Sequence, residues 1–230
     1  MSTILITGAN KGLGYEAARR LLGAGHDVWV AARDPDRGRR AAEQLGARFV
    51  PLDVTDDASV AAAAEQVAAA GGLDVLVNNA GISGGRIPIP EVTADDVRRV
   101  LETNVVGIVR VTQASVPLLE RSPNPVIVNV SSGMGSLAVT TDPERLESTI
   151  VGLAYPMSKS AVNMLTTQYA KALPNMRVNA VDPGYTGTDF NDHRGTQTVQ
   201  EGTDAIVAMA QIGPDGPTGA FVDRHGRVPW

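Results

Sequence analysis

Short, uniformly apolar runs alternate along this chain with longer stretches in which apolar residues recur at helical spacing. Apolar runs without alternating polar positions are typical of strands covered by helices on both faces, and the Ala-, Arg- and Glu-rich stretches between them predict amphipathic helices. We expect seven strands, at Thr3–Thr7, Asp27–Ala32, Ala47–Leu52, Val75–Asn78, Pro125–Val130, Arg177–Val181 and Ala220–Val222. We expect helices at about 13–24, 36–46, 57–70, 94–121, 155–173 and 199–212.

This order of elements predicts repeated strand–helix–strand units, and therefore an α/β fold built on a doubly wound parallel sheet of about seven strands with helices on both faces. No internal repeat, low-complexity tract or long linker interrupts the chain, so we expect a single domain over residues 1–230. In such a sheet the ligand crevice lies outside the carboxyl ends of the strands. Side chains that directly follow strands are therefore the first candidates for a site.

Composition and charge limit the classes of function. A formal net charge of −5 offers no basic surface for nucleic acid. No apolar run approaches the ~20 residues of a membrane span, and Met1 is followed at once by an expected strand, which leaves no room for a signal peptide. The absence of cysteine fits a reducing compartment, so we expect a cytoplasmic protein. Three isolated histidines predict no metal site, which excludes a zinc route to alcohol oxidation.

A glycine-rich segment follows the first expected strand and leads into the first helix. Glycines there let the backbone turn tightly and approach a pyrophosphate, with the helix N-terminus directed at the anion. The spacing GxxxGxG differs from the dinucleotide fingerprint GxGxxG, so a plain strand–helix turn remains the alternative for this segment taken alone. The candidate cofactor-binding residues are Gly8, Asn10, Lys11, Gly12, Leu13 and Gly14.

The residue that follows the second expected strand is Arg33. Dinucleotide-binding folds that use NAD carry an acidic residue near this place, which binds a ribose 2′-hydroxyl, whereas an arginine can pair with a 2′-phosphate in bidentate fashion. Lys11 is a candidate for a second positive contact. The alternative is a solvated arginine at a strand end. We predict NADP(H) as the cofactor.

Small and polar residues follow the next strands as well. Asp53 and Val54 end the third strand, where a carboxylate can accept a hydrogen bond from an adenine amino group, although Asp53 is also an ordinary N-cap residue. Further candidates are Asn79, Ala80 and Gly81 after the fourth strand, Ser131 or Ser132 after the fifth, and Pro183, Gly184, Thr186 and Thr188 after the sixth. An Asn-Gly-type turn is the alternative for the fourth-strand group. Because parallel strands end at one edge, all these weak signals converge on one crevice.

Tyr155 and Lys159 stand four residues apart in an expected helix, so the phenol and the ammonium share one face. A nearby cation stabilises a phenolate, and we expect Lys159 to lower the pKa of Tyr155 towards the range useful for acid–base catalysis. An accidental surface pair is the alternative. The chain argues against it, because only Lys11, Lys159 and Lys171 are lysines among 20 basic residues, and a lysine retained here suggests a place where arginine does not serve.

The order and spacing of these motifs resemble those of the short-chain dehydrogenase/reductase family over nearly the whole chain. The matching residues are Thr7-Gly8…Gly12-Leu13-Gly14, Asn78-Asn79-Ala80-Gly81, Asn104, Ser132, Tyr155…Lys159 and Pro183-Gly184. The resemblance implies a Rossmann fold and a catalytic group of Asn104, Ser132, Tyr155 and Lys159, with Lys159 also holding the nicotinamide ribose and Asn104 holding a water that relays protons. Ser132 is preferred over Ser131 because it precedes Gly135 by three residues, as the family's serine usually precedes its glycine.

Ser132 and Tyr155 are 23 positions apart, more than is usual in the family, and the extra residues around Thr140 to Thr149 resemble the insertion of monomeric carbonyl reductases. The resemblance therefore implies an NADPH-dependent carbonyl reductase or alcohol dehydrogenase in which Tyr155 is the acid/base. A non-catalytic NADP(H) sensor and a nucleotide-bound isomerase or dehydratase are the alternatives. We expect a small carbonyl or alcohol substrate, no nucleic-acid or membrane partner, and a monomer or small homo-oligomer. Residues 133–134, 137–154, 185 and 189–197 are the expected pocket walls.

Overall fold

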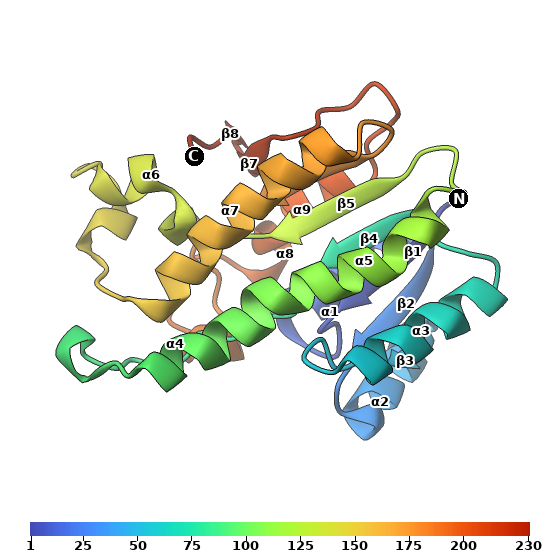
Figure 1. The fold of residues 1–230 in the computed structure, drawn as a ribbon, viewed down its shortest axis with the longest axis horizontal. Coiled ribbons are helices and arrows are strands. Elements are labelled where there is room, and N and C mark those ends of the chain that lie inside the picture. Colours follow the sequence, from blue (N-terminus) through green and yellow to red (C-terminus); the bar gives the residue numbers. More distant parts are fainter.

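Eight strands form one sheet in the order β3-β2-β1-β4-β5-β6-β7-β8 (Figure 1). The computed structural model describes residues 1–230. The strands are β1 (Thr3–Thr7), β2 (Asp27–Ala32), β3 (Arg48–Pro51), β4 (Val75–Asn78), β5 (Val126–Val130), β6 (Arg177–Val181), β7 (Phe221–Asp223) and β8 (Gly226–Arg227). All pair in parallel except β8, which runs antiparallel to β7. The chain order reverses between β1 and β4, which is the topological switch point of a doubly wound sheet.

Helices cover both faces of this sheet (Figure 1). One face carries α1 (Gly12–Gly23), α2 (Pro35–Leu45), α8 (Val199–Gly202) and α9 (Asp204–Ala210). The other carries α3 (Asp57–Ala69), α4 (Ala94–Leu101), α5 (Gly107–Leu119) and α7 (Ala154–Ala172). Successive side chains of a strand point to opposite faces, so in β1 Ile4 and Ile6 enter one core and Leu5 enters the other. The doubly wound prediction is confirmed.

Helix ends follow local chemistry. The Asp34 carboxylate accepts from the backbone N–H groups at positions 36 and 37 at the start of α2, Pro35 presets the first turn, and Gly46 ends the helix in the left-handed region. Thr93 and Asp96 form a reciprocal capping box at the start of α4. These caps fix where α2 and α4 begin without help from the core.

The structure differs from the predicted elements in four places. The expected helix 94–121 is interrupted by a π-helical segment, η2 (Glu102–Val106), and the expected helix 199–212 breaks at Thr203. β8 was not predicted, because two exposed residues carry no strand pattern. The region between β5 and α7, where no element was predicted, folds into η3 (Gly133–Gly135), α6 (Leu137–Thr141) and η4 (Leu146–Thr149). Two further short 3-10 turns, η1 (Ile89–Glu91) and η5 (Asp189–Asn191), lie in other loops.

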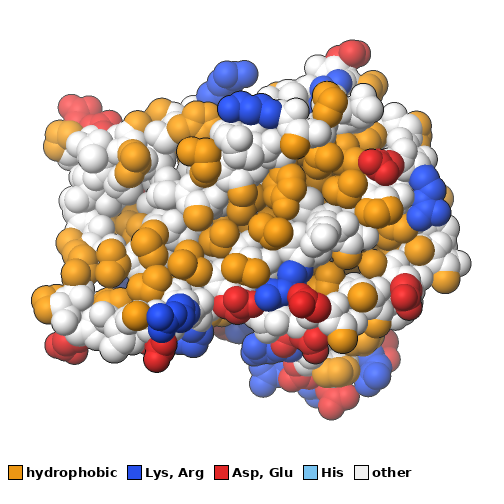
Figure 2. All heavy atoms as spheres, in the orientation of Figure 1, with side chains coloured by type: hydrophobic (Ala, Val, Ile, Leu, Met, Phe, Trp, Pro, Cys, Tyr) orange, Lys and Arg blue, Asp and Glu red, His pale blue; other side chains and the backbone are white.

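Hydrophobic side chains gather over the face formed by α5 and α7, and charged ones gather near α2 and α3 (Figure 2). Val106, Val109 and Met164 are among the exposed apolar residues of the first of these surfaces. No helix has the combination of length and apolar character that crossing a membrane requires.

Candidate active site at the carboxyl edge of the sheet

Ser132 lies in the turn that leaves β5. Its hydroxyl accepts a hydrogen bond from the Met134 N–H (3.2 Å) and caps η3. At Gly135 a Cβ would come within 2.5 Å of the Lys159 backbone, so only glycine lets this turn pack directly against α7. The hydroxyl of Ser131 is buried and donates instead to the Asn163 side chain (2.5 Å). This placement favours Ser132 over Ser131 as the serine available to a substrate.

Tyr155 and Lys159 lie one turn apart in α7, as their spacing predicts. The Lys159 ammonium lies 5.6 Å from the centre of the Tyr155 ring and donates to the carbonyl of Val130 (2.8 Å). Lys159 is 5% exposed, and its burial lowers the pKa of the ammonium to about 8, while the Asp182 carboxylate raises it. The pair therefore lies at the carboxyl edge, with Lys159 buried and Tyr155 half-buried, rather than on the open surface of the helix.

The prediction that Lys159 lowers the pKa of Tyr155 is wrong for this arrangement. Burial of the phenol raises its pKa, a hydrogen bond with the Ser132 side chain lowers it, and the negative charge of Asp182 raises it further. Desolvation is the largest of these causes, and the Lys159 ammonium is not among them: it lies 5.6 Å from the ring centre and donates to a backbone carbonyl. The phenol is kept protonated at neutral pH, which is the form that can donate a proton.

Asp182 is a buried acid that the sequence analysis overlooked. It follows β6 immediately, is 6% exposed, and one of its oxygens accepts from the Gly184 N–H (2.9 Å). Burial raises the pKa of its carboxyl, and the backbone N–H groups of Gly184 and Gly133 lower it. An acidic residue between an apolar strand and a Pro-Gly turn was the signal that could have identified it.

Asn104 lies in the π-helical segment and is 1% exposed. Its amide donates to the Ile82 carbonyl (2.9 Å) and to the Ser158 hydroxyl (3.0 Å), and its oxygen accepts from the Ile82 N–H (2.8 Å). Single-turn π-bulges inside α-helices occur often at functional sites. Here Asn104 ties the loop after β4 to α7, next to Tyr155 and Lys159.

The glycine-rich loop has the shape of a phosphate cradle. Gly8 and Gly12 adopt positive φ angles of 65° and 58°, which side chains other than glycine rarely do. A Cβ on Gly14 would lie 2.5 Å from the Asn79 amide and 2.9 Å from the Gly8 carbonyl. Asn79 donates to the carbonyls of Thr7 and Gly8 and so fixes this loop against the end of β4. The backbone is open to close approach by a pyrophosphate, with Asn10, Leu13, Ala80 and Gly81 in the same loops.

Arg33 is exposed at the end of β2. The carboxylate of its neighbour Asp34 pairs with Arg37 (3.4 Å) and therefore does not neutralise the Arg33 guanidinium. Lys11 behaves differently from the expectation: its ammonium pairs with Asp189 across the crevice (3.0 Å). Arg33 is thus an exposed positive group at the strand end where a 2′-phosphate is expected.

The other predicted cofactor residues are placed along the same edge. One oxygen of Asp53 accepts from the N–H and the hydroxyl of Thr55, and Asp56 rather than Asp53 caps α3. Val54 contacts Gly107, where a Cβ would lie 2.8 Å from its side chain. After β6, the remaining residues form a turn with positive φ followed by a capped 3-10 turn, and they are Pro183, Gly184, Thr186 and Thr188.

Two side chains from the expected pocket walls reach the catalytic corner. The Phe190 ring, from η5, lies 5.4 Å from the Tyr155 ring, centre to centre, at an angle of 59°. One carboxylate oxygen of Glu147, from η4, lies 2.9 Å from the position that a Cβ on Gly133 would take. Neither residue carries a motif, so the sequence indicated only their segments.

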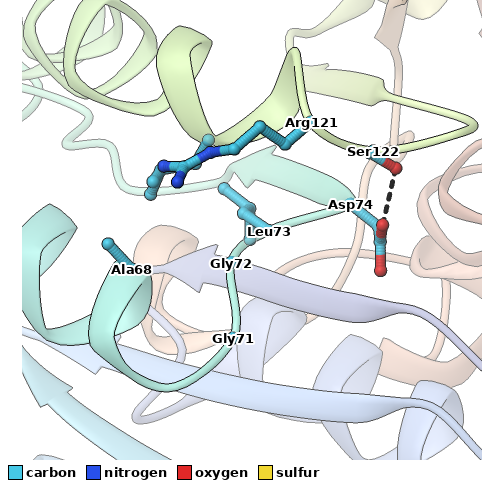
Figure 3. Close-up of a pocket in the computed structure, with 8 residues that line it drawn as sticks. Ala68, Gly71, Gly72, Leu73, Asp74, Arg121 and Ser122 are labelled. Atoms are coloured by element: carbon cyan, nitrogen blue, oxygen red, sulfur yellow. Dashed lines mark hydrogen bonds between the residues drawn. The ribbon is translucent and has the colours of Figure 1, made fainter.

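A separate hollow of about 200 Å³ lies at the opposite edge of the sheet, between the ends of α3 and α5 (Figure 3). There the Asp74 carboxylate accepts from the Ser122 hydroxyl (2.5 Å) and from the Thr3 N–H (2.8 Å). The Asp74 carboxylate in this hollow accepts hydrogen bonds from two donors, and none of the candidate catalytic residues lines the hollow. The candidate active site is therefore the carboxyl edge.

The protein family follows from comparison with known proteins. The family model of short chain dehydrogenases matches residues 2–198, and the chain belongs to the short-chain dehydrogenase/reductase family. The resemblance inferred from the motifs is thereby confirmed.

Among the relatives, (−)-isopiperitenone reductase of Mentha piperita is 33% identical over 299 aligned positions, which cover 96% of this chain and 95% of that protein. The alignment is longer than this chain, so the Mentha enzyme carries segments that are absent here. An NADPH-bound carbonyl reductase from chicken fatty liver superimposes with a TM-score of 0.87 at 29% identity, covering 100% of this chain and 99% of the other. Salutaridine reductase from Papaver somniferum gives a TM-score of 0.85 at 29% identity, covering 97% and 99%.

Proposed function

We propose that this chain is an NADP(H)-dependent oxidoreductase that moves hydride between nicotinamide and a carbonyl compound or secondary alcohol, with Tyr155 as the acid/base. The observation that carries the proposal is the packing of the Ser132 turn on α7, which brings the serine beside Tyr155 and Lys159. The proteins named above are an isopiperitenone reductase, a salutaridine reductase and a carbonyl reductase, and the structure of the last holds NADPH. Residues 1–230 would form one domain with the substrate loops at its carboxyl edge.

The residues of the crevice fit the cofactor. The positive-φ glycines at positions 8 and 12 leave backbone room for a pyrophosphate, and the exposed Arg33 guanidinium suits a 2′-phosphate. NADP(H), when bound, supplies or accepts the hydride. Lys159 and the loops after β4 and β6 would hold its nicotinamide end.

The protein's own part in the reaction is proton transfer and positioning. In the reducing direction the Tyr155 hydroxyl donates its proton to the oxygen of the carbonyl, and the Ser132 hydroxyl donates a hydrogen bond to the same oxygen. The phenol is in its protonated form at neutral pH, which is the form that this transfer needs. Lys159 bonds α7 to the end of β5, and Asn104 bonds the loop after β4 to α7. These contacts would position the elements around the reacting atoms.

The test is to incubate the pure protein with NADPH and a panel of neutral aldehydes, ketones and quinones while following loss of the reduced cofactor. We expect turnover of at least one carbonyl class and none by Tyr155→Phe. Tight NADPH binding without turnover of any compound would instead support a non-catalytic NADP(H) sensor.

A further inference from the structure

Glu147 is turned inward from a segment that is otherwise exposed. Residues 141–146 and 149–151 are exposed, whereas the Glu147 side chain is only 19% exposed. A charged side chain loses hydration when it is buried, and buried carboxylates are normally paired. Its orientation therefore calls for a partner.

The carboxylate faces the turn that carries Ser132. Its Oε1 and the Oδ2 of Asp182 both lie 2.9 Å from the position that a Cβ on Gly133 would occupy. Gly133 directly follows Ser132, so Glu147 is placed beside the candidate catalytic serine by the insertion between β5 and α7. The insertion thus places a carboxylate against the turn that carries Ser132.

One oxygen of this carboxylate lacks a hydrogen bond within the protein. Its Oε2 is enclosed and accepts no hydrogen bond, and its ion pair with the Nε of Arg145 is long (3.5 Å) and involves a side chain that is 45% exposed. Glu201 shows the contrast, because it receives Arg224 (2.8 Å) and both donors of Thr198. An enclosed acceptor without a donor is costly, so a donor from a ligand is favoured there.

The surroundings make the local charge negative. Asp182 lies next to Glu147, and the charges of Glu147 and Asp223 both raise the pKa of Asp182. The buried ammonium of Lys159 donates to the Val130 carbonyl and interacts with the Asp182 carboxylate, so it offsets that charge, whereas Glu147 is paired only with the half-exposed Arg145. A cationic group entering the pocket is attracted by this field, and a carboxylate is repelled.

We propose that Glu147 determines substrate specificity by binding an ammonium group, so that the site selects cationic over anionic carbonyl compounds. This inference rests on the proposed function, because it concerns the substrate of that reaction. It names a class of substrate, namely carbonyl compounds that also carry a protonated amine.

The test compares substrates that differ only in charge. The neutral carbonyl compound that turns over fastest in the panel is prepared with a methyl, an aminomethyl or a carboxylate substituent, for example as para-substituted acetophenones. At neutral pH and low salt we expect kcat/KM for the aminomethyl compound to exceed that for the methyl compound by roughly tenfold or more, with the carboxylate compound poorest. In Glu147→Gln, which keeps the shape of the side chain, the three values should converge.

Two further variants separate this role from a general effect of the insertion. Glu144→Gln removes an exposed acid from the same segment and should leave the charge preference unchanged. Arg145→Gln removes the nearest competing cation and should strengthen the preference for the aminomethyl compound. Equal kcat/KM for the three compounds in the wild type, or a preference that persists in Glu147→Gln, would overturn the assignment of Glu147 and leave the reductase intact. Failure of every neutral carbonyl compound would overturn the proposed function itself.

Discussion

The two edges of the sheet bury polar groups in opposite ways. At the amino edge, the Asp74 carboxylate is met by a backbone N–H and a serine hydroxyl, and it stabilises the fold. At the carboxyl edge, burial lowers the pKa of Lys159 and raises those of Tyr155 and Asp182. Perturbed titratable groups that converge in a crevice are typical of functional sites. The polar groups at the amino edge are thus matched by donors, whereas those at the carboxyl edge have the perturbed pKa values that the proposed function would use.

The largest effect is expected at Tyr155. Tyr155→Phe keeps the ring against Phe190 and removes only the hydroxyl, so turnover should fall by roughly 10²–10⁴ while NADPH affinity changes little. Tyr169→Phe, on the same helix, is the matched control and should retain activity. Steady-state kinetics with a titration of NADPH binding measure both. Activity of Tyr155→Phe within a few-fold of wild type would remove the phenol from the mechanism.

The charged ammonium of Lys159 should lower the free energy of unfolding at pH values below its folded-state pKa. Because that pKa, about 8, lies below the 10.5 of a free lysine, the unfolded chain binds more protons between these values, and the free energy of unfolding rises with pH across this window. Lys159→Met should therefore be inactive yet more stable at pH 7 by up to about 3 kcal/mol, a gain that shrinks as the pH rises from 8 to 10.5. Denaturant unfolding at several pH values checks it.

The control for this experiment is Lys171→Met, an exposed lysine of the same helix. The difference in free energy of unfolding between Lys171→Met and wild type should stay the same over this pH window. If Lys159→Met and wild type showed parallel pH dependence, the buried ammonium would not be under strain, and the contrast between the two edges would lose its main support.

Arg33 should decide the choice of cofactor. Charge-assisted hydrogen bonds to a phosphate contribute about 1.5–3 kcal/mol, so Arg33→Ala should lower the ratio of kcat/KM for NADPH over NADH by roughly ten- to a hundredfold. Arg37→Ala is the control, since Arg37 is paired with Asp34. Substitution of Ala32 by an acid is the poorer test because Ala32 is buried. A ratio that stays unchanged in Arg33→Ala would place the 2′-phosphate elsewhere.

The smallest effect on activity is expected at the amino edge. Asp74→Asn replaces one acceptor oxygen by a donor that faces the Thr3 N–H or the Ser122 hydroxyl, and it should lower the free energy of unfolding by about 1–3 kcal/mol. kcat/KM should stay within a few-fold of wild type. Asp215→Asn, an exposed substitution, should change neither quantity. Loss of activity in Asp74→Asn without loss of stability would mean that the two edges are not functionally distinct.

Local patterns were enough for the elements that recur along the chain. Apolar runs at strand period and caps such as Asp34 with Gly46 act over a few residues, so the strands and most helix starts could be predicted from sequence. Two kinds of element were missed. β8 is a two-residue strand that closes a tight hairpin with β7 and is too short to carry a strand pattern. The π-helical turn around Asn104 depends on distant contacts, because it occurs where the Asn104 side chain bonds to Ile82 and Ser158.

By itself the sequence determined the family, the doubly wound sheet and the edge at which Ser132, Tyr155 and Lys159 meet, because strand order and motif spacing fix which chain segments end together. The tertiary structure alone decided the electrostatics of that edge. It turned Lys11 towards Asp189, buried Asp182 beside Lys159, and brought Glu147 to the serine turn. Burial and charge–charge distances are sums over residues remote in the chain, so no local pattern records them.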